Sequence, residues 1–164
     1  MTAAAEFYRQ ALPGLRCGVV KTRAAADPAD RRGRLIFGSA PADRICEGGV
    51  WYALDLRLNQ DASFYLDTRA LRQWLRENLR GKTVLNTFAY TGSLGAAAWA
   101  GGAARVLQTD LNPRFLALAR QSCQLNGFAT ADQDFAAGDF FRQVGALRRA
   151  GARFDCAILD PPFF

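Results

Sequence analysis

Residues 83–92 decide the fold of this 164-residue chain, and they read Thr-Val-Leu-Asn-Thr-Phe-Ala-Tyr-Thr-Gly. An apolar run of strand length is followed by a polar turn that ends in Gly92, and a helical pattern begins near that glycine. The uncharged stretch from Thr83 to Ala104 has the length of a membrane span, but it holds several polar residues and four glycines. We therefore interpret it as strand, loop and helix rather than as a membrane segment.

Three further apolar runs of strand length follow at helix-sized intervals, at residues 105–109, 134–137 and 154–159. One of the helical patterns between them opens at Asn112-Pro113, a cap followed by proline at the first helical position. Because right-handed crossovers leave few other arrangements for strand–helix repeats, we expect an α/β fold, a Rossmann-like doubly wound parallel sheet. The fourth strand would be an exposed hydrophobic edge, which favours self-association unless another chain covers it.

Each predicted strand ends in a polar group, and in a parallel sheet these ends meet along one edge. Asp110 follows Gly92 by 18 residues, close to the spacing at which a carboxylate accepts hydrogen bonds from the ribose of an adenosine ligand. Phe88 and Tyr90 stand where a pyrophosphate-binding turn has glycines, so NAD fits poorly. S-adenosylmethionine lacks a pyrophosphate and fits better, with Asp139 placed to hold its adenine.

The sequence resembles class I S-adenosylmethionine-dependent methyltransferases, in particular the family that includes the large-subunit rRNA cytosine-5 and guanine-N7 methyltransferases. The likeness covers about residues 47–164. The segments that carry it are Phe64-Tyr65-Leu66-Asp67-Thr68-Arg69, the turn at 86–92, Asp110, Gly138-Asp139 and Asp160-Pro161-Pro162-Phe163-Phe164.

The resemblance implies roles for these positions. The methionine end of the cofactor would be framed by Asn86, Ala89, Tyr90 and Gly92. Asp110 would bind the ribose and Asp139 the adenine, while Asp160, Pro161 and Pro162 would be the catalytic residues that hold the target base. The implied cofactor is S-adenosyl-L-methionine, the implied substrate is RNA, in particular 23S rRNA, and the implied location is the cytoplasm, with no membrane partner.

Several of these residues have a simpler structural interpretation. Asp110 and Asp139 each precede a predicted helix and could cap it, and Asp160 could belong to an ordinary turn. Residues 64–69 could serve either the structure or the substrate.

The nucleophile available in the chain bears on which base is methylated. Histidine is absent, which excludes His-dependent triads and most zinc sites within these residues. A base nitrogen can attack the methyl group directly, whereas carbon 5 of cytosine first needs a cysteine thiolate. Cys17, Cys46, Cys123 and Cys156 form no C-x-x-C pair and none follows a strand end near Asp160, so we expect all four to be structural or incidental. For cytosine-5 chemistry the resemblance implies a nucleophile beyond residue 164.

Residues 1–66 predict a small β-rich N-terminal region, and residues 67–164 the N-terminal half of the methyltransferase domain. Hairpin strands are predicted at 16–20, 34–38 and 50–58. A helix is predicted from Asp67 to Gly81, with Trp74 in the core and Arg72 on the polar side. The net charge of 21 − 15 = +6 is compatible with a polyanionic partner, and the charged residues Glu6 and Arg9 argue against a signal peptide and for a cytoplasmic protein.

Three functions remain open at this point. The chain could be the cofactor-binding half of a methyltransferase acting on rRNA, which is the interpretation we favour, because further strands are expected in a complete domain of that class. It could instead be a non-catalytic module that binds S-adenosylmethionine or RNA and works with a partner chain. A nucleotide-dependent oxidoreductase is disfavoured by Phe88 and Tyr90.

Overall fold

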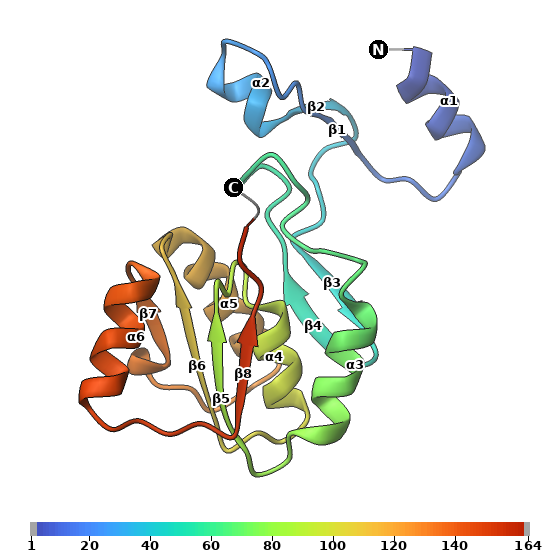
Figure 1. Cartoon of the computed structure of the whole chain (residues 1–164). Coiled ribbons are helices and arrows are strands. Elements are labelled where there is room, and N and C mark those ends of the chain that lie inside the picture. The colour runs from blue at the N-terminus through green and yellow to red at the C-terminus, as the bar shows by residue number, and fades with distance from the viewer. Residues whose placement is uncertain (1–2, 163–164) are drawn as a thin grey trace. The chain divides into compact units, whose positions relative to one another are not determined.

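The computed structural model describes residues 3–162 and divides the chain into two compact units. The front unit comprises Met1–Arg44 and Leu54–Ser63, and the sheet unit comprises Ile45–Ala53 and Phe64–Phe164. The sequence predicted a boundary between residues 66 and 67, whereas this division assigns residues 45–53 to the sheet unit. Each unit is described by itself (Figure 1).

The front unit pairs two short strands around a helical turn. It contains α1 (Ala3–Ala11), β1 (Gly18–Val20), α2 (Pro28–Arg32) and β2 (Arg34–Phe37), and β1 pairs with β2 in antiparallel fashion. The Lys21 amine lies 2.5 Å from the carbonyl oxygen of Asn59 and also donates to that of Asp61. Partial burial lowers the pKa of Lys21. This amine therefore ties the loop before Ser63 to β1.

The sheet unit contains the parallel sheet that the sequence predicted, with strand order β7-β6-β5-β8. The strands are β5 (Thr83–Thr87), β6 (Arg105–Asp110), β7 (Phe135–Ala137) and β8 (Cys156–Leu159). Asp155 fastens the entry of β8 to β5, because its carboxylate accepts hydrogen bonds from the backbone amide and the hydroxyl of Thr83 at 2.7 and 2.8 Å. These bonds hold the pKa of Asp155 below its ordinary value.

Helices lie on both faces of this sheet (Figure 1). They are α3 (Arg69–Asn78), α4 (Ser93–Ala100), α5 (Pro113–Leu125) and α6 (Phe140–Arg149), with a short 3-10 turn at Asp132–Asp134. Asn112 caps α5 by accepting a hydrogen bond from the amide of Arg114, with Pro113 next, as the sequence predicted. The predicted α/β class and doubly wound arrangement are confirmed.

Helix α4 is the centre of the sheet unit and is buried from Leu94 to Trp99. Its sequence is apolar on all sides and rich in small residues, which is typical of a helix enclosed by other elements. At its end, a Cβ built on Gly101 would lie 2.5 Å from the carbonyl oxygen of Arg76, so this glycine allows α3 and α4 to approach closely. The core cluster joins α3, α4 and α5 to the sheet, and its buried members are Leu75, Leu79, Val84, Leu94, Ala97, Ala98, Trp99, Val106, Cys123 and Ile158.

A hairpin that the sequence predicted only in part packs on α5. It consists of β3 (Arg44–Glu47), which was not predicted, and β4 (Val50–Ala53). Asn126 bonds the backbone of Trp51 through both its amide nitrogen and its oxygen, at 2.7 and 2.9 Å, and so imitates a neighbouring strand. The strand predicted over 50–58 was too long, because β4 ends at Ala53 and the chain turns at residues 55–58, where the Leu58 amide bonds the carbonyl of Asp55.

Helix α3 buries an arginine beside Leu75, and for Arg72 and Trp74 the sequence prediction was wrong. Arg72 is 0% exposed, whereas Trp74 is 50% exposed and Leu71 lies outside as well. The guanidinium of Arg72 bonds both oxygens of Glu47 at 2.7 and 2.9 Å and lies 4.2 Å from the centre of the Phe64 ring. A bidentate carboxylate and an aromatic face compensate the buried charge, which a helical periodicity based on hydrophobicity cannot reveal.

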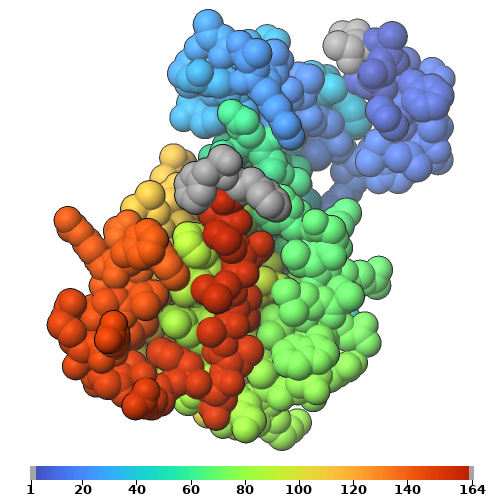
Figure 2. All heavy atoms as spheres, in the orientation of Figure 1, coloured from blue at the N-terminus to red at the C-terminus, as the bar shows by residue number. Residues whose placement is uncertain are grey.

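One face of the sheet unit leaves β8 at the surface. In the space-filling view β8 lies between α6 and α3, and Leu159 is exposed (Figure 2). The predicted hydrophobic edge is present among the described residues, whereas self-association through it remains a prediction. Within residues 3–162, no helix is long and apolar enough to span a bilayer.

The pair of Glu47 and Arg72 gives a testable prediction of stability. Glu47→Ala leaves a buried guanidinium without its carboxylate and should lower the free energy of unfolding by about 3–5 kcal/mol in urea denaturation. Arg69 is the matched control, since it lies 3.8 Å from the same carboxylate but its side chain is 77% exposed. Arg69→Ala should change stability by less than about 1 kcal/mol. Equal losses in the two variants would contradict this account.

The same pair predicts an acid-side loss of stability. Hydrogen bonds from Arg72 hold the pKa of Glu47 below its ordinary value. The stabilisation is therefore complete above the unfolded-state pKa and is lost as the pH falls through the lower folded-state value. In Glu47→Ala that part of the pH dependence should disappear.

Candidate cofactor and substrate site

The strand order reverses direction at one point of the sheet. The chain runs from β5 through β6 to β7 in one direction and returns through α6 to β8 on the other side of β5. Connections therefore diverge at the carboxyl ends of β5 and β8, the position at which doubly wound sheets bind ligands. The turn at residues 88–92 follows β5, and Asp160-Pro161-Pro162 follows β8.

The turn after β5 has an unusual backbone. Phe88 and Tyr90 have φ angles of 51° and 49°, and Gly92 has 75°. Left-handed conformations are ordinary for glycine but cost about 1–2 kcal/mol in a residue with a side chain. Phe88 and Tyr90 thus adopt the conformation for which other nucleotide-binding turns use glycine, and the turn pays for it in strain.

Hydrogen bonds and ring contacts offset this strain. The amide of Tyr90 bonds the carboxylate of Asp110 at 2.8 Å, a charged bond worth about 1.5–3 kcal/mol. The Phe88 ring stacks on Phe140 at 4.7 Å and the Tyr90 ring meets Phe115 edge-on at 4.5 Å, each worth about 0.5–1.5 kcal/mol. Glycine at either position would relieve the backbone strain there but would also remove the ring contact that the side chain makes.

Asp110 joins two loops at the carboxyl ends of adjacent strands. One carboxylate oxygen accepts from Tyr90 in the turn after β5, and the other accepts from the amide of Asn112 at 2.8 Å. The alternative that Asp110 caps the following helix is wrong, because Asn112 is the N-cap of α5 and Asp110 bonds the amide of that cap residue. A carboxylate has about four lone-pair sites, so two bonds leave capacity for ribose hydroxyls.

A buried pair of amides lies beneath the turn and the start of α4. Asn86 of β5 donates to the side-chain oxygen of Gln108 on β6 at 3.2 Å, and both residues are buried. A Cβ at Gly95 would lie 2.3 Å from that oxygen, and one at Gly92 would lie 2.3 Å from the Cβ of Ala119. The two glycines therefore let the first turn of α4 rest directly on β6 and α5. Gln108 was not predicted, and its isolated polar position within a strand pattern was the available signal.

Asp139 caps α6. Its carboxylate accepts a hydrogen bond from the amide of Arg142 at 3.0 Å, and the side chain is exposed at the end of β7. This is the structural alternative that the sequence left open, and an exposed cap keeps lone pairs for an adenine amino group. Adenine binding by Asp139 remains a prediction.

The segment after β8 is exposed. Asp160, Pro161 and Pro162 all lie at the surface, and the two prolines restrict the backbone that presents the carboxylate. Phe163 and Phe164, the rest of that motif, lie outside the described residues. The catalytic role of this segment also remains a prediction.

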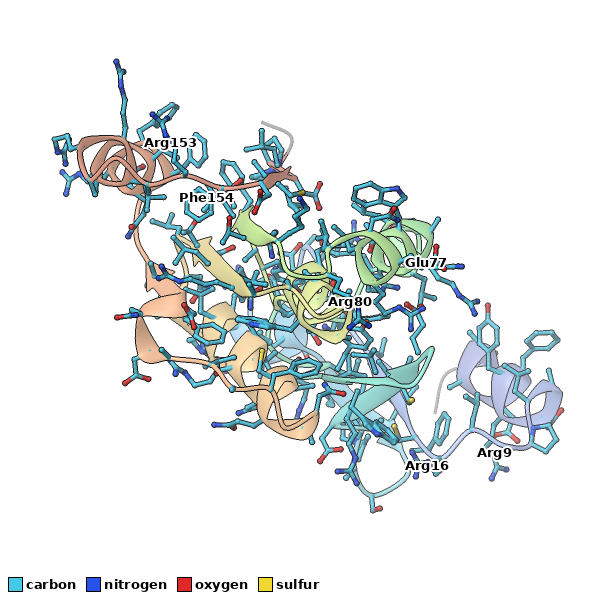
Figure 3. The ribbon with its side chains drawn as sticks, turned by 90° about the horizontal axis from the view of Figure 1, so that it is seen from below. Arg9, Arg16, Glu77, Arg80, Arg153 and Phe154 are labelled. Carbon is cyan, nitrogen blue, oxygen red and sulfur yellow. The ribbon has the colours of Figure 1, made fainter. Side chains whose placement is uncertain are left out.

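The predicted residues thus lie at the carboxyl ends of the parallel strands, and some of them are joined by direct hydrogen bonds. Tyr90 and Asp110 are bonded, Asn86 lies beneath them, and Asp139 and Asp160 end the strands at either edge. Residues 64–69 reach the site through Tyr65, whose ring lies 5.6 Å from that of Tyr90. A separate groove of about 450 Å³ lies between α6 and Leu85 of β5 and is lined by none of the predicted residues. Arg153 and Phe154, on the segment before β8, also line this groove (Figure 3).

The cysteines of the sheet unit do not supply a nucleophile to this edge. Cys123 is buried in α5 and burial raises its pKa to about 12, so its thiolate is scarce at neutral pH. Cys156 begins β8, at the end of that strand opposite to Asp160, and burial raises its pKa as well. Cys46 lies on β3 and Cys17 in the front unit, and all four thiols are free.

The contact between Gly95 and Gln108 predicts that replacing this helical glycine by alanine destabilises the chain, whereas such a replacement in a helix ordinarily stabilises it. Gly95→Ala should destabilise the chain by about 1–3 kcal/mol, because the new methyl overpacks a buried amide. Gly145 in α6 is the control, since a Cβ there would meet only Arg149 at 3.4 Å. Gly145→Ala should stabilise the chain by up to about 1 kcal/mol. Chemical denaturation tests both, and Gln108→Ala combined with Gly95→Ala should recover part of the loss.

Thiol reactivity tests the assignment of the cysteines. With a chromogenic disulfide reagent at pH 8, Cys46 should react in the folded chain, because it is exposed. Cys123 should react only after addition of denaturant, with Cys123→Ser lacking that late reaction. Rapid labelling of Cys123 in the folded chain would overturn the inert assignment.

The sequence profile of a family described as S-adenosylmethionine-dependent methyltransferase matches residues 25–164. Ribosomal RNA large subunit methyltransferase I of Aeromonas hydrophila is 37% identical over 178 aligned residues, which cover 100% of this chain and 45% of the relative. The protein of that name from Erwinia tasmaniensis is 34% identical over 79% of this chain and 33% of its own. The chain thus spans less than half the length of these relatives.

Solved structures agree with the fold. SMU.776, crystallised with SAH (S-adenosylhomocysteine), superimposes with a TM-score of 0.84 and 28% identity, over 96% of this chain and 41% of its own. A SAM-dependent methyltransferase from Agrobacterium tumefaciens has a TM-score of 0.74 and 21% identity, over 93% and 48%, and supports the fold alone. The predicted resemblance is confirmed: the chain belongs to the S-adenosylmethionine-dependent methyltransferase family.

Proposed function

We propose that this chain forms the cofactor-binding part of an enzyme that methylates a base of large-subunit ribosomal RNA. The observation that carries the proposal is Asp110, which joins the strained turn after β5 to the loop after β6 at the switch point of the sheet. The names of the relatives support large-subunit ribosomal RNA as the substrate.

The residues present fit S-adenosylmethionine. Phe88, Tyr90 and Gly92 of the turn have left-handed backbone, and Gly92 is buried with no space for a Cβ. Asn86, Ala89, Tyr90 and Gly92 would hold the methionine end, Asp110 the ribose and Asp139 the adenine. When bound, this cofactor supplies a methyl group already activated by a sulfonium, so the protein needs to position two groups and exclude water.

The target base would lie against Asp160, Pro161 and Pro162. The rigid segment can orient a base edge, and the Asp160 carboxylate can accept a hydrogen bond from a base amino or ring NH group. Transfer to a ring nitrogen such as guanine N7 needs no protein nucleophile. Transfer to cytosine C5 needs a cysteine thiolate, which Cys123 and Cys156 are unsuited to supply because burial raises their pKa values.

A second candidate is a non-catalytic module that binds S-adenosylmethionine or RNA beside a partner chain. The exposed edge strand β8 favours it, since a partner could extend the sheet there. Both candidates place the cofactor at the same residues, and turnover distinguishes them.

The cofactor site is tested by calorimetric titration of the chain with S-adenosylhomocysteine. We expect micromolar binding, none to NAD, and loss of at least tenfold in affinity in Asp110→Ala, because ribose hydrogen bonds to a carboxylate are strong. Asp160→Ala is the matched control and should keep the affinity while abolishing any methyl transfer to ribosomal RNA. Folded wild-type chain that fails to bind S-adenosylhomocysteine would refute the proposed site.

A further inference from the structure

The ring of Tyr65 lies beside the turn after β5, and neither the roles proposed for the cofactor residues nor those proposed for residues 160–162 account for it. Tyr65 is 47% exposed, whereas its neighbour Phe64 is buried against Tyr52 and Arg72. Its ring lies 5.6 Å from the ring of Tyr90, which in turn meets Phe115. Tyr65 is therefore one end of a row of three aromatic rings, and the middle ring, Tyr90, belongs to the turn after β5.

The backbone of Tyr65 is held with unusual firmness for an exposed residue. Its carbonyl oxygen accepts hydrogen bonds from the buried guanidinium of Arg72 at 2.8 Å and from the hydroxyl of Thr68 at 3.0 Å. Arg72 is itself fixed by Glu47. The ring of Tyr90 contacts the ring of Tyr65 at an interplanar angle of 45°, so the side chain of Tyr65 has a defined neighbour as well as its backbone.

A fixed and half-exposed aromatic ring is suited to stacking with a nucleobase. Proteins recognise unpaired RNA by stacking splayed bases on such rings, and a nearby cation then meets the phosphate backbone. Arg69, four residues further along, has a side chain that is 77% exposed, and the whole chain carries a net charge of +6. Segment 64–68 leads into α3 at the end of the sheet unit where the parallel strands terminate (Figure 1).

We propose that Tyr65 is the stacking residue for an unpaired base of the RNA substrate, held in place by Arg72 and Tyr90. The proposal rests on the proposed function, because it assumes that the partner at this edge is RNA. The sequence left it open whether residues 64–69 have a structural role or contact the substrate. The proposal gives Phe64 and Thr68 a structural role and places Tyr65 against the substrate.

The test measures RNA binding and cofactor binding separately on the 164-residue chain. Fluorescence anisotropy with a labelled, unstructured RNA oligonucleotide reports the first, and calorimetry with S-adenosylhomocysteine reports the second. Tyr65→Ala should weaken RNA binding about 5- to 100-fold, the range for loss of one stacked base. Tyr65→Phe should stay within about threefold of the wild type, since it keeps the ring, and Tyr65→Leu should behave as Tyr65→Ala does while preserving apolar volume.

Two controls make the result specific. Trp74→Ala removes an aromatic side chain of similar exposure on the outer side of α3 and should leave RNA affinity unchanged. An abasic strand of the same length should bind the wild type and Tyr65→Ala equally, because it offers phosphates but no bases. In all variants the affinity for S-adenosylhomocysteine should remain that of the wild type.

Each contrary result has a distinct meaning. Loss of S-adenosylhomocysteine affinity in Tyr65→Leu with unchanged RNA affinity would place Tyr65 in the cofactor site and overturn the proposal. Equal losses in Trp74→Ala and Tyr65→Ala, or an equal loss with the abasic strand, would also overturn it. Failure of the wild type to bind S-adenosylhomocysteine refutes the cofactor site instead, and the RNA arm still decides the role of Tyr65.

Discussion

The bond between the Tyr90 amide and the Asp110 carboxylate is the constraint on which the site depends. It holds a bulky residue in a left-handed conformation and connects the carboxyl ends of two adjacent strands. Without it, the turn after β5 could relax to an ordinary loop, and the backbone groups that face the crevice would lose their orientation. The glycines at 92 and 95 complete this arrangement, because they allow α4 to begin directly above Gln108. Strain, close packing and one charged hydrogen bond therefore fix the same few residues.

The second fixed point is the Arg72 guanidinium, which acts on the other side of the site. A buried charge with a bidentate partner contributes little net stability compared with an apolar core, but it is costly to break and highly directional. In this chain its remaining hydrogen bonds go to the hydroxyl of Thr68 and the carbonyl of Tyr65. The segment that enters α3 is thereby oriented relative to the hairpin that carries Glu47. The two fixed points meet where the rings of Tyr65 and Tyr90 come together.

The sequence predicted the sheet unit well where hydrophobic periodicity decides the structure. Local patterns of apolar and polar residues were enough to predict the four parallel strands, the capped helix at Asn112-Pro113 and the polar residues at the strand ends. Prediction failed where a distant residue changes the outcome. Arg72 is buried because Glu47 and Phe64 compensate its charge, and Trp74 is displaced to the surface as a result. Strand β3 and the end of β4 likewise depend on hairpin pairing and on Asn126, which lies 75 residues beyond Trp51. For the site, the sequence indicated the residue types at the strand ends, but not that Phe88 and Tyr90 take up the glycine-like conformation.

That last difference bears on how a methyltransferase of this kind distinguishes its ligands. A glycine-rich turn brings backbone amides close to a pyrophosphate and leaves the rest of the site open. Here the same backbone path is kept, but two aromatic rings project from it, each packed against a second ring from another strand end. At these two positions the rings take up space that glycines would leave open. The strain at Phe88 and Tyr90 is thus consistent with selection for a ligand without phosphate at the cofactor position, and for an aromatic surface where the acceptor enters.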